Sequence, residues 1–309
     1  MGKRKVIYPE KKTWYRCWRM KKRSGGYRTI EAPNDDLKAK QKKLYKQLMC
    51  TYKASSIANC GVRKRNTVRA AKQIIGLKYK WKTDIHDFFG SITGDMIEKA
   101  LLENKKVSPK LAKAVRYACT NKYDVLPQGA PTSPFLANVA CAKMFNFMAK
   151  AVHLVKGKVT SYADDIIVSA PDAEHLAKAK HIVYKLLREN GLFINKEKSK
   201  FLRRKQVALG ICVAEGADHP RLPRKDRYNL RAWLHNVEKA LLEGKTVKEP
   251  DLNQLYGHVA YADMVGDQFA GRFNAKVMRI RELAKNRTEK PRIKIIKKKE
   301  AEHAEVQQG

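Results

Sequence analysis

The chain has 309 residues, of which 43% are apolar, so it can bury the core of one or two globular domains. Its 66 Lys and Arg residues outnumber 30 Asp and Glu residues, and the formal charge of +36 predicts a polyanionic partner, most simply nucleic acid. The sequence contains no apolar run of membrane-spanning length, no apolar segment typical of a signal peptide and no CxxC pair among its six cysteines. These features predict a cytoplasmic chain with no membrane partner, no zinc site and no disulfide scaffold.

The first part of the chain is predicted to contain a hairpin and two helices. Strand-forming segments on either side of Arg23-Ser24-Gly25-Gly26 predict a hairpin over residues 14–33. The Asn and Asp residues at 34–36 are typical of a helix start, and leucines follow them at helical spacing. A basic loop at 61–66 then precedes a short helix expected over 67–75.

The later elements alternate between helices and short strands. In chain order we expect a strand from Tyr79, helices at 94–104, 108–120 and 132–151, a hairpin at 159–170, a helix at 172–190, short strands at 192–195 and 206–213, and mostly helical structure from about 226 to 285. The segment after 285 is poor in aromatic residues and carries like charges, which predicts disorder until nucleic acid binds.

Carboxylates mark the ends of two predicted strands. Asp164 and Asp165 lie at the tip of the second hairpin, but such a pair is weak evidence alone, because Asp favours turns and Asp35-Asp36 is explained as a helix start. Asp84 ends another strand, where its alternative role is a strand-end cap. Two strands that end in carboxylates can present them side by side, and such oxygen ligands suit Mg²⁺. Two ions roughly 3.5–4 Å apart could activate a 3′-hydroxyl and stabilise the leaving pyrophosphate.

Three segments in this order resemble motifs of the bacterial reverse transcriptases, most closely the retron type. Residues 162–165 match the YADD catalytic box, and residues 83–89 resemble the DIxxFF box that supplies the first catalytic aspartate. Residues 126–134 are similar to the LPQGAPTSP signature that precedes the palm helix. The shared order and spacing make the resemblance specific, and it covers roughly residues 14–285.

The resemblance implies an α+β architecture, the right-hand polymerase fold with fingers, palm and thumb. The parts expected in chain order are fingers at 1–80, a palm with interleaved fingers helices at 81–213, a thumb at 214–285 and a basic, disordered tail at 286–309.

The resemblance also implies which residues perform catalysis. Asp84, Asp164 and the Ile85 carbonyl would hold two Mg²⁺ ions, for which Mn²⁺ could substitute, with Asp165 close by as the third catalytic acid. Phe89 would exclude the 2′-hydroxyl of a ribonucleotide, so that deoxynucleotides are preferred. The alternative reading makes Phe89 an ordinary core aromatic.

Further contacts are implied along the chain, and for each cation the alternative is a solvated side chain. The resemblance implies contacts of Arg28 and Lys22 with the triphosphate, of Gln128 and Gly129 with the nucleotide, and of Leu209 and Gly210 in the primer grip. Separately, the excess positive charge predicts that Arg63, Lys64 and Arg65 of the basic loop contact RNA.

Two departures from the retron pattern leave the subtype open. Residues 70–74 lack the Asn and His of the NAxxH element, and the VTG triplet is replaced by residues 208–210. The chain could therefore be a divergent retron enzyme or a neighbouring phage-defence reverse transcriptase.

The resulting hypothesis is an RNA-templated DNA polymerase in a bacterial anti-phage defence system. Its partners would be a structured non-coding RNA template, the DNA product and deoxynucleoside triphosphates, with a toxin or effector protein as a further candidate. Two alternatives remain open: a catalytically silent RNA-binding protein on the same fold, and a metal-dependent nuclease with clustered carboxylates.

Overall fold

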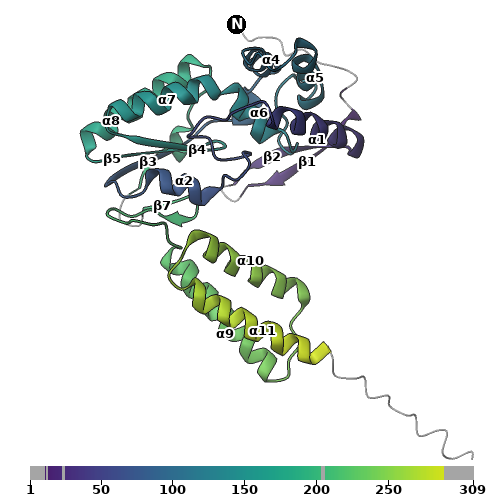
Figure 1. The fold of residues 1–309 in the computed structure, drawn as a ribbon, viewed down its shortest axis with the longest axis vertical. Coiled ribbons are helices and arrows are strands. Elements are labelled where there is room, and N and C mark those ends of the chain that lie inside the picture. Colours follow the sequence, from purple (N-terminus) through teal and green to yellow (C-terminus); the bar gives the residue numbers. More distant parts are fainter. Residues whose placement is uncertain (1–10, 12, 23–24, 203–205, 289–309) are drawn as a thin grey trace, which may run out of the picture. The chain divides into compact units, whose positions relative to one another are not determined.

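A computed structural model describes residues 11, 13–22, 25–202 and 206–288. They divide into two compact units, one ending at Pro223 and the other beginning at Arg224 (Figure 1). The tail expected at 286–309 lies almost entirely outside the described residues.

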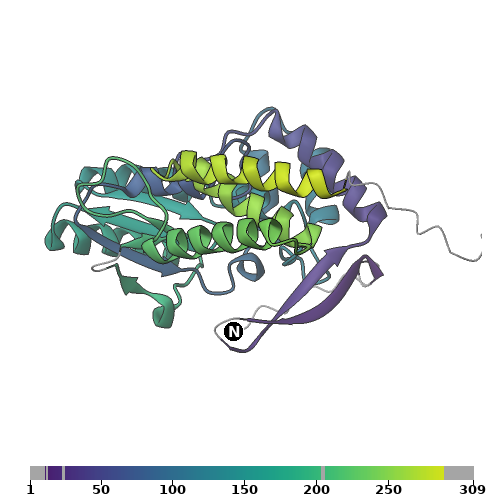
Figure 2. The same ribbon diagram turned by 90° about the horizontal axis from the view of Figure 1, so that it is seen from below.

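The N-terminal hairpin and the helix after it form as predicted. Strands β1 (Tyr15–Lys21) and β2 (Tyr27–Pro33) pair antiparallel. Helix α1 (Asp35–Met49) begins after Asn34, whose side chain accepts a 2.9 Å hydrogen bond from the Leu37 N–H. This cap satisfies one of the amide groups that a helix start leaves unpaired. In Figure 2 the hairpin extends away from the central sheet of the same unit.

The central sheet has the strand order β4-β5-β3-β6, and all its pairs are antiparallel. Its strands are β3 (Tyr79–Asp84), β4 (Lys158–Tyr162), β5 (Asp165–Ala170) and β6 (Lys200–Phe201). Ile166, Ile167 and Val168 of β5 are all fully buried, so both faces of this strand are covered. Continuous apolar burial of this kind fixes the strand at the centre of the core.

Helices surround the sheet in the first unit. They are α2 (Thr67–Ile74), α3 (Phe88–Ser91), α4 (Gly94–Leu102), α5 (Pro109–Cys119), α6 (Ser133–Ala140), α7 (Ala142–Leu154) and α8 (Ala173–Glu189). Helices α2, α7 and α8 pack directly against the strands (Figure 1).

Two predictions for this unit are wrong in detail. The single helix expected at 132–151 divides at Cys141, where φ is −90° and ψ is 0°. Hydrogen bonds from the Cys141 N–H to Ala137 and from the Phe145 N–H to Cys141 continue across the division, so the helix is kinked rather than interrupted. The strand expected at 192–195 is reduced to an isolated bridge between Ile194 and Ile85.

The second unit consists of three helices in its described part. They are α9 (Arg224–Leu242), α10 (Glu249–Val265) and α11 (Ala270–Thr288), as the sequence predicts. Leu234, Leu255 and Ile280, one from each helix, are fully buried and form the centre of this unit. Within the described residues, no helix is both long and apolar enough to cross a membrane.

Candidate active site

Three carboxylates meet at one end of the central sheet. Strand β3 ends at Asp84, which pairs in register with Asp165, the first residue of β5. Asp164 lies in the turn between β4 and β5, and its carbonyl accepts a 2.8 Å hydrogen bond from the Ile85 N–H. Backbone pairing therefore places all three acids next to one another although Asp84 is 80 positions away in sequence.

The turn that carries Asp164 is held by its neighbours. Ala163 adopts the left-handed conformation (φ 54°), which is uncommon for a residue with a side chain. The loop before α2 pairs with the adjacent strand, because the Ser161 N–H donates to Ile57 and the Asn59 N–H donates to Ser161. The Asn59 side chain also donates a 2.9 Å hydrogen bond to the Thr160 hydroxyl. These contacts hold the strained turn in one position.

Two lysines neutralise the outer acids of the cluster. Lys198 Nζ lies 3.0 and 3.1 Å from the two Asp84 oxygens, and Lys82 Nζ lies 2.8 Å from Asp165 Oδ1. Burial, followed by the negative charges of Asp84 and Asp165, raises the pKa of Asp164 to about 6. The cluster is therefore a site where an additional positive charge is favourable.

The donor set fits a divalent cation of the magnesium type. Its carboxylate oxygens and the adjacent Ile85 backbone carbonyl are the hard ligands that such ions prefer. Within the part of the chain that the structure describes, no three His, Cys, Asp or Glu side chains are already arranged to hold an ion. Because Lys198 Nζ lies 3.0 and 3.1 Å from the two Asp84 oxygens, a cation bound at Asp84 would have to displace it.

The Gln128-Gly129 loop is attached to the N-terminal hairpin. The Glu31 N–H donates a 2.7 Å hydrogen bond to the Gln128 carbonyl, and Asn121 Nδ2 donates to the Glu31 carboxylate at 2.8 Å. Gly129 has φ +134°, and a Cβ there would lie 3.0 Å from both the Glu31 carbonyl oxygen and Ile30 Cγ2. Glycine is thus required where the loop passes the hairpin.

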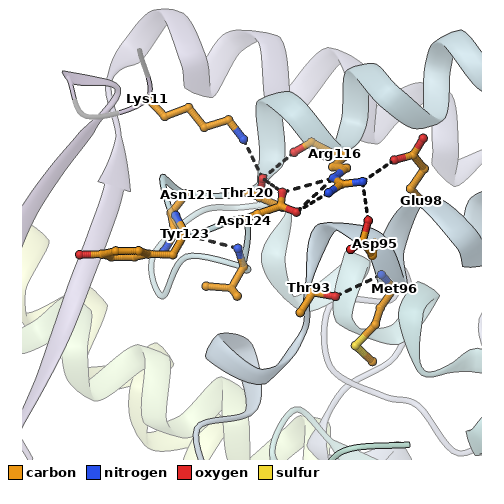
Figure 3. Close-up of polar contacts among 11 residues, drawn as sticks. Lys11, Thr93, Asp95, Met96, Glu98, Arg116, Thr120, Asn121, Tyr123 and Asp124 are labelled. Carbon is orange, nitrogen blue, oxygen red and sulfur yellow. Dashed lines mark hydrogen bonds and ion pairs between the residues drawn. The ribbon is translucent and has the colours of Figure 1, made fainter. Parts of the chain in front are cut away.

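A polar network fixes the turn just before this loop (Figure 3). The Arg116 guanidinium donates to Asp124 at 2.7 Å and to Glu98 at 2.9 Å. The Thr120 hydroxyl contacts Asp124 at 3.0 Å and accepts a 2.8 Å hydrogen bond from Lys11 Nζ. Burial lowers the pKa of Lys11 to about 8, against the opposing effect of Asp124. Because Asp124 precedes the loop by only four residues, the network anchors the approach to Gln128.

The two phenylalanines after Asp84 lie in different environments. Phe88 is 3% exposed and belongs to the core, whereas Phe89 is only partly buried and packs against it. Their ring centroids lie 5.5 Å apart. Phe89 is therefore the ring of the pair that retains access to solvent, close in sequence to the acids.

Of the basic residues expected to contact the triphosphate or RNA, some are exposed and one is hydrogen-bonded within the protein. Arg28 and Lys22 of the hairpin are exposed, as are Arg63 and Lys64 of the basic loop. Arg65 points inward, and its guanidinium donates to backbone carbonyls of the 54–58 segment at distances of 2.5 to 3.4 Å. Arg65 thus stabilises the loop that pairs with the strand before the Asp164 turn.

Leu209 and Gly210 form the turn of a small hairpin. They connect β7 (Val207–Ala208) to β8 (Ile211–Cys212), and both have positive φ, 53° and 76°. A two-residue turn with positive φ at both positions matches the right-handed twist of the flanking strands.

Sequence reasoning missed the ion pair of Lys82 and the hydrogen bonds of Asn59. Side chains alternate along a strand, so Lys82, two positions before Asp84, had to lie on the same face as that acid. That signal was present in the sequence. The position of Asn59 depends on a loop pairing that no local pattern indicates.

Comparison with known proteins agrees with this geometry. A family model described as reverse transcriptase (RNA-dependent DNA polymerase) matches residues 20–213, more than half of the chain. This chain belongs to the reverse transcriptase family.

Relatives within the reverse transcriptase family include retron enzymes. The chain is 27% identical over 276 residues to the retron Mx65 reverse transcriptase of Myxococcus xanthus, an alignment covering 84% of this chain and 63% of that protein. It is 27% identical over 216 residues to the retron Ec86 reverse transcriptase of Escherichia coli, covering 68% of this chain and 65% of that protein. The alignments thus span less than two thirds of these two relatives.

The fold is shared with more distant polymerases. A telomerase structure from Candida albicans, in complex with a fragment of telomeric RNA, matches with a TM-score of 0.50 at 13% identity, covering 87% of this chain and 59% of that one. Together with the family match, this confirms the α+β right-hand polymerase fold expected from the motifs.

Proposed function

We propose that this protein is an RNA-directed DNA polymerase that works by two-metal nucleotidyl transfer. The observation that carries the proposal is the convergence of Asp84, Asp164 and Asp165 at one end of the sheet, on the fold of the reverse transcriptase family. The pKa of Asp164, raised by burial and then by the charges of Asp84 and Asp165, supports it, because a bound cation would stabilise the ionised carboxylates.

Asp84, Asp164 and the Ile85 carbonyl would hold two Mg²⁺ ions, with Asp165 as the third acid and Mn²⁺ as a possible substitute. When bound, the ions would activate the primer 3′-hydroxyl and stabilise the charge of the leaving pyrophosphate. Lys198 would leave Asp84 on metal binding, and Lys82 would keep Asp165 in place.

The nucleotide would be held between the hairpin and the loop bonded to it. Arg28 and Lys22 would neutralise the triphosphate, and Gln128 and Gly129 would lie against the nucleotide. The hydrogen bond between Glu31 and Gln128 supports this arrangement, because it fixes the distance between the two elements.

Sugar selection and primer placement would depend on two further features. Phe89 would block the 2′ position of an incoming nucleotide, and its partial exposure, five positions after Asp84 in sequence, supports that role. Leu209 and Gly210 would form the primer grip.

The domain plan follows the same proposal. Residues 1–80 would form the fingers, 81–213 the palm with interleaved fingers helices, and 214–285 the thumb. In the structure residues 214–223 belong to the first compact unit and the three-helix unit begins at Arg224.

The template would be a structured non-coding RNA, copied into DNA as part of an anti-phage defence system with a toxin or effector partner. Similarity to retron reverse transcriptases and the charge of +36 support an RNA partner. The exposed Arg63 and Lys64 would contact this RNA, whereas the inward position of Arg65 favours a structural role for it.

A primer-extension assay on an RNA template, with labelled primer and deoxynucleotides, tests the proposal. Extension that requires Mg²⁺ is the expected result. Degradation of the nucleic acid would instead identify a nuclease, and retention without turnover would identify a binding protein; either outcome would overturn the proposal.

A further inference from the structure

A cavity lies at the edge of the central sheet, away from the carboxylates. Its volume is about 700 Å³. It is lined by the start of β3, the first half of α8 and residues on either side of the 203–205 segment. Tyr79, one of the lining residues, precedes Asp84 by five positions on β3, which corresponds to about 17 Å along an extended strand. The cavity is therefore separate from the candidate active site.

Exposed aromatic rings stand at this cavity, each beside a lysine. Phe201 on the edge strand β6 is 54% exposed, and Tyr79 is 37% exposed. Lys180 Nζ lies 5.3 Å from the Phe201 ring centroid, and Lys78 Nζ lies 5.7 Å from that of Tyr79. Exposed aromatic rings beside ammonium groups give a surface on which a planar group can stack.

The charge around the cavity is positive. Lys78, Lys80 and Lys180 line it, and Glu215 is the only acid among the described lining residues. Lys80 is 1% exposed and its ammonium donates to Gln206 Oε1 at 2.8 Å and to the Leu77 carbonyl. This bonding fixes the Lys80 ammonium at the cavity that Lys78 and Lys180 also line.

We propose that the cavity binds a single-stranded segment of RNA outside the polymerase active site. A base would stack on Phe201 or Tyr79, and the neighbouring phosphates would be neutralised by Lys180 and Lys78. Aromatic rings beside cations are the usual composition of single-strand binding surfaces. An acidic peptide could use the lysines but would leave both rings without a stacking partner. The inference rests on the proposed function only in taking RNA as the ligand.

Equilibrium binding of the full chain to two labelled oligonucleotides tests this site. One is an RNA of about 12 nucleotides, and the other has the same backbone without bases. Stacking on Phe201 predicts that Phe201→Ala weakens binding of the RNA by about fivefold to 100-fold and leaves binding of the abasic strand unchanged. The matched control is Phe147→Ala on α7, where the ring is 59% exposed and does not line the cavity. It should change neither affinity.

The phosphate contact has its own prediction. Lys180→Ala should weaken binding of both strands and reduce the slope of log affinity against log salt by about 0.7. Lys178→Ala serves as the control, because Lys178 lies on the same helix and pairs with Glu174 instead. Equal effects of Lys180→Ala and Lys178→Ala would overturn the phosphate contact.

Cross-linking locates the bound RNA directly. RNA containing 4-thiouridine should attach to Tyr79 or Phe201 on irradiation, and attachment only elsewhere would overturn the proposal. Competition by polyglutamate as effective as competition by RNA would identify an acidic protein as the ligand and would also overturn it. Primer extension by the wild-type protein is measured in parallel. Absence of extension would contradict the polymerase proposal, whereas the binding and cross-linking results test the RNA site.

Discussion

Replacing Gly129 with alanine tests the attachment of the nucleotide-side loop to the hairpin. The backbone has φ +134° there, and a Cβ would approach the Glu31 carbonyl oxygen and Ile30 Cγ2 to 3.0 Å. A side chain forced into such a backbone conformation costs about 1–3 kcal/mol. Displacing the loop also weakens the 2.7 Å hydrogen bond from Glu31 to Gln128, which contributes about 1 kcal/mol.

The two effects together predict that Gly129→Ala lowers the free energy of unfolding by about 2–4 kcal/mol. In a unit of this size that corresponds to a Tm lower by roughly 4–16 °C, measurable by calorimetry. The KM for deoxynucleotides should rise as well, because the loop would move relative to the hairpin that carries Arg28.

Gly191→Ala is the matched control for backbone strain alone. Gly191 has φ +72°, but a Cβ there would meet nothing within 4 Å. We expect a loss of only about 1–2 kcal/mol and no change in KM. If Gly129→Ala were no more destabilising than Gly191→Ala, the close approach of loop and hairpin described above would be refuted.

Three further predictions concern other parts of the first unit. Phe89→Ala should increase ribonucleotide use relative to deoxynucleotide use in primer extension, and unchanged discrimination would mean that Phe89 is a core residue only. Arg65→Ala should lower Tm because it removes the guanidinium hydrogen bonds to three backbone carbonyls, whereas Arg63→Ala should leave Tm unchanged and weaken RNA binding; the reverse pattern would contradict the assigned roles. Burial lowers the pKa of Lys80 to about 8, with Glu215 opposing the shift. The unfolded chain therefore binds more protons at this residue between about pH 8 and 10.5, so the unfolding free energy should rise with pH over that window more steeply in the wild type than in Lys80→Met, in which Lys11 still contributes.

Much of the local structure could be predicted because local rules determine it. The Asn34 cap, the hairpin glycines and the continuous apolar run of β5 each agree with one short stretch of sequence. At these positions the conformation that the local sequence prefers is the one that the overall fold needs. The motif resemblance added that Asp84 and Asp164, far apart in the chain, belong to one site.

Features that depend on tertiary contacts could not be predicted. The kink at Cys141 occurs in an apolar stretch without proline or glycine, so no residue there signals it. The sequence does not distinguish Arg65 from the basic residues beside it. Its guanidinium points inward because it donates hydrogen bonds to carbonyls of the 54–58 segment. The contact of Lys198 with Asp84 likewise depends on the return of the chain at Lys198, which no local pattern indicates.

The most direct test of the central claim compares Asp164→Asn with Asp35→Asn in Mg²⁺-dependent primer extension. The first variant keeps the shape of the side chain and removes a proposed metal ligand, whereas Asp35 is an exposed residue in the first turn of α1. Two-metal catalysis predicts that Asp164→Asn lowers the incorporation rate at least about 100-fold, with RNA affinity near that of the wild type. Asp35→Asn should incorporate at the wild-type rate. Substantial DNA synthesis by Asp164→Asn would contradict the account.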